Sequence, residues 1–593
     1  MTVGAQNNID SIDIYNQIQE HASKYKVTQW MYDAVFTDHR EVIKDTAFFV
    51  KGNRTVNPYT PYKGRIIRNI FVEPLDPFGY SANDTLYAKP GKFERLGNNF
   101  HVSTQKNVIR NLLLFKKNKP LDPLEISESE RLLRLSPYVN DAHIYIRRIK
   151  GGDSVDVIVV EQDKWTTLAG VGIDGDNVQL NLVERNFFGV GHQFEENLFW
   201  DNLHPRLSSS GKYSVFNIRK SFITASLFYS DLAETKNLGF SLDRTFYSPL
   251  AKWAGGLLLT RNFNLLKQTV NGDVNNIKKY ERHFTVQDFW VAKSYHLTES
   301  KQAKISQRAK SYITGARYFQ VDFFDGESFV VDSSKQNRDQ TMWLFNLGFT
   351  QRKYYRDRYL FRFGANEDIP QGVSAEVILG TSKWEQSSLL YYNGVKFGAG
   401  KHFEKIGYIS GGFSYGTFYN SSSFGAGVLN INGFYFSDLI QTGRWFFRGF
   451  SRFQLEQGFN REPYQSVNIN GIQMYGFKSP SLTGKSKMVL NFEFVLYAPY
   501  ELIGFKLAPI LLCGLGTLGN NLGDLFNTGV YQAYALGLLI RNEHLIVNTF
   551  ELSIGLYPFV PGKGDFILRL NPISYNTVRA ADFIVGKPDL VPY

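Results

Sequence analysis

For more than 400 residues after Trp165, apolar and polar side chains alternate along strand-like stretches that are separated by polar or Gly-containing turns. The clearest stretch is RWFFRGFSRFQLEQ (444–457), where arginine, glutamine and glutamate share one face and tryptophan and leucine share the other. TFELSIGLYPF (549–559) and FILRLN (566–571) repeat the pattern. A period of two residues is that of a β-strand, so this part of the chain predicts a mainly β fold.

Alternation alone does not say which face of a strand points outward, because a soluble sandwich would also alternate. Three features favour a membrane barrel. The sixteen to twenty candidate strands are often about 9–12 residues long, charged residues recur in mid-strand, and aromatic residues, 15% of the chain, crowd the strand ends. We therefore predict a transmembrane antiparallel β-barrel with a polar lumen, since closure removes the strand edges that lipid cannot satisfy.

Several function classes are excluded by what the chain contains. No apolar run reaches the roughly 18 residues of a membrane-spanning helix. The net charge is +11, but Lys and Arg are scattered, so we expect no nucleic-acid partner. The single Cys513 and the scattered histidines offer no metal-ligand cluster. GLGTLG (514–519) matches a dinucleotide fingerprint in form, but no βαβ unit follows it. We expect no enzyme activity, no metal and no cofactor.

Residues 1–62 are predicted to form a helical N-terminal segment. SIDIYNQIQEHASKY (11–25) has apolar residues at helical spacing, and TQWMYDAVF (28–36) reads as a second short helix. MTVGAQNN lacks the charged and apolar regions of a signal peptide, yet TVGAQ is typical of the small-residue end of one. We interpret residues 1–5 as a signal-peptide remnant, and the alternative is a disordered terminus.

Residues 63–164 mix helical and strand signals. GRIIRNIFVE (64–73) reads as a strand and TQKNVIRNLLLFKKN (104–118) as a helix. SESERLLRLSP (127–137) reads as a second helix that begins with a capping-box pattern and is stopped by proline. Two more strands follow, AHIYIRRI (142–149) and SVDVIVVEQ (154–162). The order predicts a three-stranded sheet backed by two helices.

The architecture resembles the BamA/TamA-like superfamily of outer-membrane proteins, in which periplasmic POTRA domains precede a sixteen-stranded barrel. SESERLLRLSPYVNDAHIYI with DSVDVIVVEQDKW resembles the second half of a POTRA domain, VERNFFGVGHQF resembles the hairpin that opens the barrel, and NEDIPQG is a weaker match to a mid-barrel segment. The resemblance covers nearly the whole chain beyond residue 60. It implies a POTRA-like domain at 63–164, a barrel of about 16 strands at 165–593, and a barrel-opening hairpin at Asn186, Gly189 and Gly191.

A fourth motif lies in a loop expected near 460–486. In the family, the sixth extracellular loop folds into the lumen and carries a [V/I]-R-G-[F/Y] motif whose Arg contacts acidic residues on the inner wall. The resemblance assigns Tyr475, Gly476 and Phe477 to the tip of this loop. It makes Glu493, on the polar face of the next strand, their lumen partner.

Tyr475 stands where the family usually has Arg. A phenol donates one hydrogen bond, whereas a guanidinium offers a bidentate charged pair. The loop-to-wall latch is therefore either weaker here or rebuilt with another cation, for which the candidates are Lys478, Lys485 and Arg448.

Two further segments have alternative interpretations. The strand with Ala142, Ile144 and Ile146 is either an open edge that could add a client strand or an interior strand of its sheet. Tyr593 resembles a barrel-folding signal at the end of a last strand. The prolines of the final stretch favour the alternative that FILRLNPI (566–573) is the last strand and the rest is a short periplasmic tail.

The resemblance implies a protein of the bacterial outer membrane, with its N-terminal domain in the periplasm, that assists insertion, assembly or translocation of client proteins. A weakly closed seam between first and last strands would admit client strands. The implied partners are outer-membrane lipid and lipopolysaccharide, unfolded outer-membrane clients, and periplasmic or lipoprotein partners of the POTRA-like domain. The alternatives are a dedicated exporter or channel for one protein or lipid, and a structural subunit of a larger outer-membrane complex.

Overall fold

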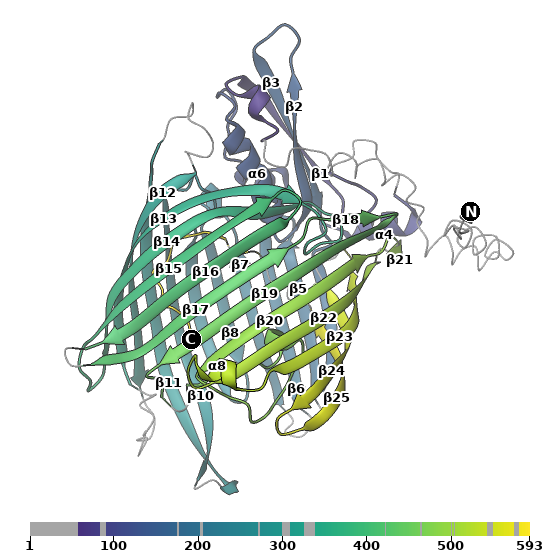
Figure 1. Cartoon of the computed structure of the whole chain (residues 1–593). Helices are drawn as coiled ribbons and strands as arrows, with labels where there is room; N and C mark the ends of the chain where they lie inside the picture. Colours follow the sequence, from purple (N-terminus) through teal and green to yellow (C-terminus); the bar gives the residue numbers. More distant parts are fainter. Residues whose placement is uncertain are drawn as a thin grey trace, which may run out of the picture.

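The computed structural model describes residues 57–593, except for 83–89, 175–176, 202–205, 271–272, 299–308, 325–337, 421–422, 463–464, 500, 503–504, 543–548, 575–579 and 581. The helices expected at 11–25 and 28–36 lie outside the described residues. Two parts follow one another along the chain. A small α+β unit stands at one end of a large antiparallel barrel (Figure 1).

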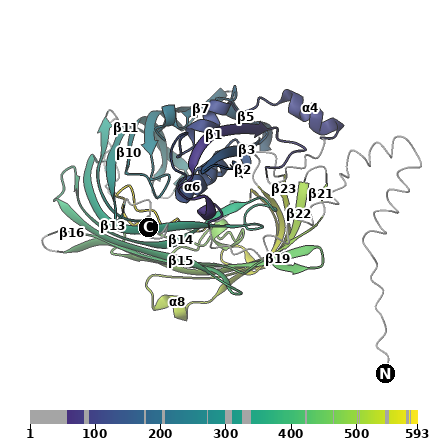
Figure 2. The same ribbon diagram turned by 90° about the horizontal axis from the view of Figure 1, so that it is seen from above.

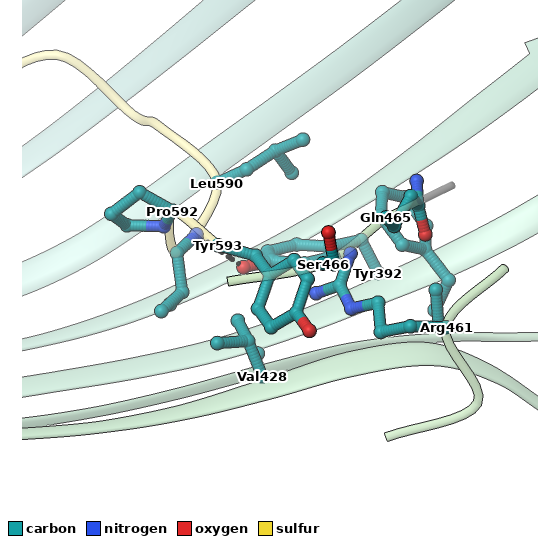
Figure 3. A pocket seen from close by; sticks show the side chains of 12 residues that line it. Tyr392, Val428, Arg461, Gln465, Ser466, Leu590, Pro592 and Tyr593 are labelled. Carbon is teal, nitrogen blue, oxygen red and sulfur yellow. Dashed lines mark hydrogen bonds between the residues drawn. The ribbon is translucent and has the colours of Figure 1, made fainter. Parts of the chain in front are cut away.

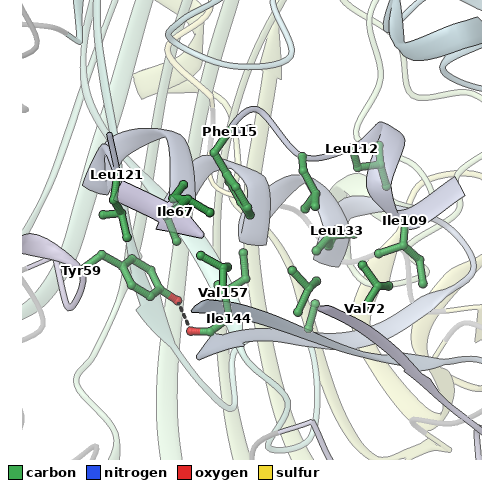
Figure 4. Packing of buried hydrophobic residues seen from close by; sticks show 14 of the residues in the cluster. Tyr59, Ile67, Val72, Ile109, Leu112, Phe115, Leu121, Leu133, Ile144 and Val157 are labelled. Atoms are coloured by element: carbon green, nitrogen blue, oxygen red, sulfur yellow. Dashed lines mark hydrogen bonds between the residues drawn. The ribbon is translucent and has the colours of Figure 1, made fainter. Parts of the chain in front are cut away.

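The α+β unit is the predicted three-stranded sheet. β3 (Ser154–Asp163) is central, parallel to β1 (Ile66–Leu75) and antiparallel to β2 (Val139–Arg148). Its described helical elements are η1 (Thr60–Tyr62), α4 (Lys92–Phe100), α5 (Lys106–Asn111) and α6 (Pro123–Leu135). Ile67, Ile109, Leu133 and Val157 form the centre of the apolar core between helices and sheet (Figure 4). We call this part the POTRA-like unit.

The helices of this unit differ from the prediction. α4 was not predicted, and α5 has six residues where a helix over 104–118 was expected. α6 begins at Pro123, because the Asp122 side chain accepts a hydrogen bond from the Leu124 amide. Ser127 and Glu130, expected to cap the helix, therefore lie inside it. None of the helices in the described part of the chain is long and apolar enough to cross a membrane.

The barrel is closed, with strands in chain order and β25 returning to β4. Figures 1 and 2 show the strands of the barrel from the side and from above. The described residues give twenty-two strand segments, more than the expected sixteen, and two of them, β18 and β21, have only three and two residues. The strands are β4 (Thr167–Asp174), β5 (Asn177–Phe187), β6 (His192–Asp201), β7 (Arg206–Val215), β8 (Thr224–Asp231), β9 (Thr235–Arg244), β10 (Trp253–Val270), β11 (Asp273–His296), β12 (Lys310–Phe324), β13 (Gln340–Asp357), β14 (Glu367–Trp384), β15 (Leu390–Phe403), β16 (Gly407–Tyr419), β17 (Phe424–Phe436), β18 (Ile440–Thr442), β19 (Trp445–Phe459), β20 (Ser486–Tyr497), β21 (Glu501–Leu502), β22 (Phe505–Gly519), β23 (Tyr531–Arg541), β24 (Phe550–Val560) and β25 (Gly564–Ser574). Short helical turns η2 (Ile218–Lys220), η3 (Ile472–Met474) and α8 (Asp524–Asn527) lie between strands.

The predicted alternation places apolar side chains on the outside of the barrel and polar side chains on the inside. On β20, Phe494 and Leu496 are exposed, while Asn491 and Glu493 are buried. The same outward exposure of large apolar side chains recurs around the barrel, as at Leu347 of β13 and Ile554 of β24. A continuous apolar exterior is what a barrel presents to hydrocarbon rather than to water.

The two closing strands carry highly exposed outward-facing side chains. Phe566 and Leu568 of β25 are 76% and 70% exposed, and Val171 of β4 is 71% exposed. The outward-facing Leu552 and Leu556 of β24, which has a strand on each side, are 39% and 38% exposed. Leu536 of β23, within the sheet, is 68% exposed, so high exposure is not confined to the closing strands.

The last described segment runs inside the barrel. β25 ends at Ser574, as one interpretation of FILRLNPI expected, but residues 582–593 are neither a final strand nor a periplasmic tail. They lie against the inner wall, and the chain end appears within the ring in both ribbon views (Figures 1 and 2). Their contacts are with inward-facing residues such as Arg317 and Asn346. We call residues 582–593 the lumen strap.

Candidate functional site: the barrel rim and the in-folded loop

A buried cluster of charges joins α6 to the rim of the barrel. The Arg134 guanidinium donates to the Asp368 carboxylate at the start of β14, with an Nη2–Oδ1 distance of 2.7 Å, and lies 3.2 Å from Glu130. Arg356 of β13 also pairs with Glu130, which has no exposed surface. At this depth, pairing with an opposite charge offsets the free energy that each group loses when it leaves water. The cluster therefore fixes the POTRA-like unit to strands β13 and β14.

The pKa of the Glu130 carboxyl is set by two opposing effects, burial and the nearby cations. Burial alone would raise the pKa of this carboxyl, but Arg356, Arg134 and His143 outweigh burial and hold the pKa well below its usual range. The Tyr59 hydroxyl also donates to Glu130, at 2.5 Å. Glu130 is thus a charged centre for groups from both parts of the chain.

The turn between β13 and β14 (358–366) completes the joint. The Glu367 carboxylate accepts hydrogen bonds from the backbone amides of Leu360, Phe361 and Arg362, which holds the turn in one shape. From this turn, the Asn366 amide donates to the Asp141 carboxylate at 3.0 Å. The segment NEDIPQG was singled out only as a weak family match, and the structure gives its first three residues a docking role.

The hairpin at Asn186, Gly189 and Gly191 is a second contact between the two parts. It joins β5 to β6, and Gly189 O accepts a hydrogen bond from the Gln105 amide at the start of α5. A Cβ on Gly189 would lie 2.5 Å from Ser103 O, and the φ of 71° also favours glycine. Asn186 bridges the turn, accepting from Gly191 N and donating to Thr104. The sequence identified this hairpin, and the structure shows what its glycines accommodate.

The edge of β2 is partly closed. β2 is an edge strand of its sheet, as the client-binding interpretation of Ala142, Ile144 and Ile146 requires. However, Ala142 O already accepts from Arg134, and Ile144 O accepts from the Tyr59 hydroxyl at 3.1 Å. Arg362 of the barrel turn donates to Asn140 O. Strand addition along 140–144 would have to displace these donors.

The loop between β19 and β20 folds into the lumen, and its tip lies against β24 and β25. Gly476 N donates to Gly471 O and Gly471 N to Phe477 O, which makes a tight turn. Phe477 is fully buried and packs on Tyr557, with ring centroids 6.1 Å apart. Gly476 has a φ of 82°, and a Cβ there would lie 2.8 Å from the Tyr557 hydroxyl. A tip that packs this closely accepts only glycine at this position.

Tyr475 makes its hydrogen bonds to backbone and to a neighbouring phenol. Its hydroxyl donates to Phe492 O at 3.2 Å, one residue before Glu493, and its own carbonyl accepts from Tyr557. Burial, followed by the nearby Glu493 carboxylate, raises the pKa of the Tyr475 phenol well above its usual range, so the phenol stays a donor. The predicted pairing of Tyr475 with Glu493 stays a prediction.

The three candidate replacement cations lie elsewhere. Lys478 is exposed, and Lys485 donates to Arg461 O at 2.9 Å. Arg448 lies at the rim beneath the β13–β14 turn, 3.3 Å from Asp357. Arg452 of β19 lowers the pKa of the Tyr475 phenol, but burial and Glu493 outweigh this effect. Arg452 shares a strand face with Arg448, so the alternation in β19 already placed it inward.

Replacing Gly476 by valine is expected to displace the loop tip. The left-handed backbone costs about 1–2 kcal/mol for a residue with a Cβ, and overpacking against Tyr557 and Asn571 adds about 1–3 kcal/mol. Protease cleavage within 460–485 of the purified protein should become faster by at least tenfold. Gly443→Val is the control, because Gly443 has a φ of 61° but nothing within 4 Å of its Cβ position. Equal cleavage of both variants would contradict close packing at Gly476.

No protein-family model and no curated protein matches the chain. Among solved structures, BamA from Haemophilus ducreyi lacking POTRA domains 1–3 aligns at 12% identity over 85% of this chain and 83% of its own, with a TM-score of 0.35. CdiB from Escherichia coli aligns at 10% identity over 97% and 98% (TM-score 0.38), and CdiB from Acinetobacter baumannii at 10% over 95% and 98% (TM-score 0.32).

Proposed function

We propose that this chain is a non-enzymatic outer-membrane protein that assists the insertion, assembly or translocation of client proteins. The observation that carries the proposal is the joint between the POTRA-like unit and the barrel. Buried ion pairs and a glycine hairpin fix an α+β unit at one opening of a barrel with an apolar exterior. A passive pore would not need such an attached unit at its mouth.

The apolar exterior supports a place in the outer membrane, with lipid and lipopolysaccharide around the strands. The POTRA-like unit would then lie in the periplasm. There the still accessible part of its sheet, or exposed side chains such as Phe71 of β1 and Phe100 of α4, would meet clients or lipoprotein partners.

Client strands would enter at the closing seam between β25 and β4. A client strand that pairs there would satisfy its backbone groups, which is far more favourable than leaving them open in lipid. The free energy released when the client folds would then drive its insertion, without nucleotide hydrolysis.

The alternative is a dedicated exporter for one protein. The lumen strap favours this second candidate, because it shows that the inner wall accommodates an extended chain. Export would require a client to pass through the lumen, whereas insertion would require the seam between β25 and β4 to open.

Depletion of the protein in its own host, followed by quantitative proteomics of outer membranes, tests the proposal. Loss of many unrelated barrel proteins is expected for general assembly, and loss of one exported protein for the dedicated exporter. Complementation with the wild-type gene should restore the profile, and complementation with an Arg134→Ala, Asp368→Ala variant should restore it only in part. An unchanged membrane proteome would contradict both candidates.

A further inference from the structure

The lumen strap is held by side chains of the barrel wall along its whole length. Asn346 of β13 donates to Gly586 O at 3.0 Å, and Lys396 of β15 donates to Asp589 O at 2.8 Å. Farther along, the Tyr392 hydroxyl accepts from Val591 N at 2.8 Å. The described strap residues form no strand of their own, so side chains take the place of a β-ladder. These side chains form hydrogen bonds with backbone atoms of the strap, and any extended peptide has the same backbone atoms.

A row of glycines on the wall makes room for the apolar side chains of the strap. Phe583 and Val585 are buried, while Ile584 between them is exposed, which is the alternation of an extended segment. A Cβ on Gly400 would lie 2.6 Å from the Phe583 ring, and a Cβ on Gly348 would lie 2.6 Å from a Val585 methyl group.

The same fit continues to the end of the strap. A Cβ on Gly416 would lie 3.0 Å from Val591 Cβ, and a Cβ on Gly458 would lie 2.5 Å from the Tyr593 ring. The four wall glycines come from four different strands, β13, β15, β16 and β19. Together they form a groove across the inner wall that matches the strap side chain by side chain.

Charge complementarity fixes the register of the strap. Lys587 lies 2.7 Å from the Asp288 carboxylate of β11, and Asp589 lies 2.6 Å from the Arg317 guanidinium of β12. Arg317 and Asp288 also pair with each other at 2.8 Å. A basic residue followed two positions later by an acidic one therefore meets an acidic and a basic wall residue in the matching order.

The far end of the groove is an aromatic site. The Arg461 guanidinium lies 4.0 Å from the centroid of the Tyr593 ring (Figure 3). The Tyr593 hydroxyl donates to Lys485 O. A cavity of about 400 Å³, lined also by Tyr392 and Val428, adjoins this ring. Lys485 and Arg461 belong to the in-folded loop, so the strap links that loop to the inner wall formed by β11–β19.

We propose that the inner wall of β11–β19 is a binding site for an extended peptide, which the lumen strap occupies in cis and an incoming chain of the same chemistry displaces. The ligand class is a peptide with alternating apolar side chains, a Lys-x-Asp pair and an aromatic residue four positions after the aspartate. The inference deepens the proposed function, on which it rests for the source of the displacing chain. Exchange is practicable because the strap is held by side-chain contacts that a second peptide reproduces one by one.

The test uses purified full-length protein in detergent and a fluorescent synthetic peptide with the sequence of residues 580–593. Two proteins are compared, the wild type and a Phe583→Glu, Val585→Glu variant that weakens the strap in cis. We expect saturable binding to the variant, at least tenfold tighter than to the wild type, whose own strap competes. Absence of binding to the variant, or equal affinities, would overturn the proposal.

Peptide variants make the test independent of protein folding. A peptide in which Lys587 and Asp589 are exchanged keeps composition and net charge, and should bind at least tenfold more weakly. On the protein side, Gly348→Leu in the strap-weakened background should reduce binding, whereas Gly411→Leu at an exposed wall position should not. Tight binding of the exchanged peptide would show that the groove does not recognise the order of the two charged residues in the strap. The peptide can fail to bind even though depletion removes client proteins, or it can bind although depletion changes nothing. The two experiments therefore test the two proposals separately.

Discussion

Replacing Arg134 by alanine is expected to detach the POTRA-like unit from the barrel rim. The change leaves Asp368 and Ala142 O without this donor and takes one of two guanidinium partners from the fully buried Glu130. Breaking a buried pair by removing one partner costs about 3–5 kcal/mol, because the remaining charge is uncompensated. Hydrogen exchange of the β2 amides should accelerate by about a hundredfold or more.

Two comparisons make this result specific. Arg110→Ala removes an exposed arginine from α5 and should leave exchange unchanged. A double variant with Asp368→Ala should cost less than the sum of the two single changes, since each single change breaks the same pair. Additive effects would mean that Arg134 acts on the unit alone and not through the rim.

Arg448→Ala is expected to loosen the rim from the barrel side. Arg448 has no exposed surface, donates to Ser437 O at 3.0 Å and to Arg358 O at 2.9 Å, and pairs with Asp357. Alanine would leave a buried carboxylate and two carbonyls unsatisfied by this donor, at a cost of about 3–5 kcal/mol. The temperature at which the folded, fast-migrating form is lost on gels should fall by roughly 2–5 °C.

Arg444 provides the matched control on the approach to the same strand. Its side chain is exposed, so Arg444→Ala should leave the transition temperature within a degree or two of the wild type. The β13–β14 turn should become protease-sensitive in the Arg448 variant only. An unchanged turn would show that Glu367 and its backbone contacts hold it without Arg448.

Period-two alternation predicted the barrel well because burial in a barrel wall depends on side-chain direction alone. Glu493 was placed inward from sequence, and it is inward. The number of strands was less predictable. Short pairings such as β18 and β21 add strand segments that have no periodic signal of their own.

The rim contacts and the strap could not be read from local sequence. Glu130 and Arg134 lie four residues apart on a helix, a spacing typical of a solvated surface pair. In the fold they also pair with Arg356 and Asp368, more than 200 positions away, which local spacing cannot indicate. The strap likewise has strand-like composition, and its partners lie far back in the chain, on β11 to β19.

The rim joint also has a consequence for the order of folding. Arg134 and Asp368 are separated by 234 residues, so their contact closes a very long loop and must form late, after β13 and β14 have paired. Until then, Asn140 O lacks the donor that Arg362 supplies in the finished protein. An immature chain would thus expose a longer edge of β2 than a mature one, and a chaperone could distinguish the two by that edge.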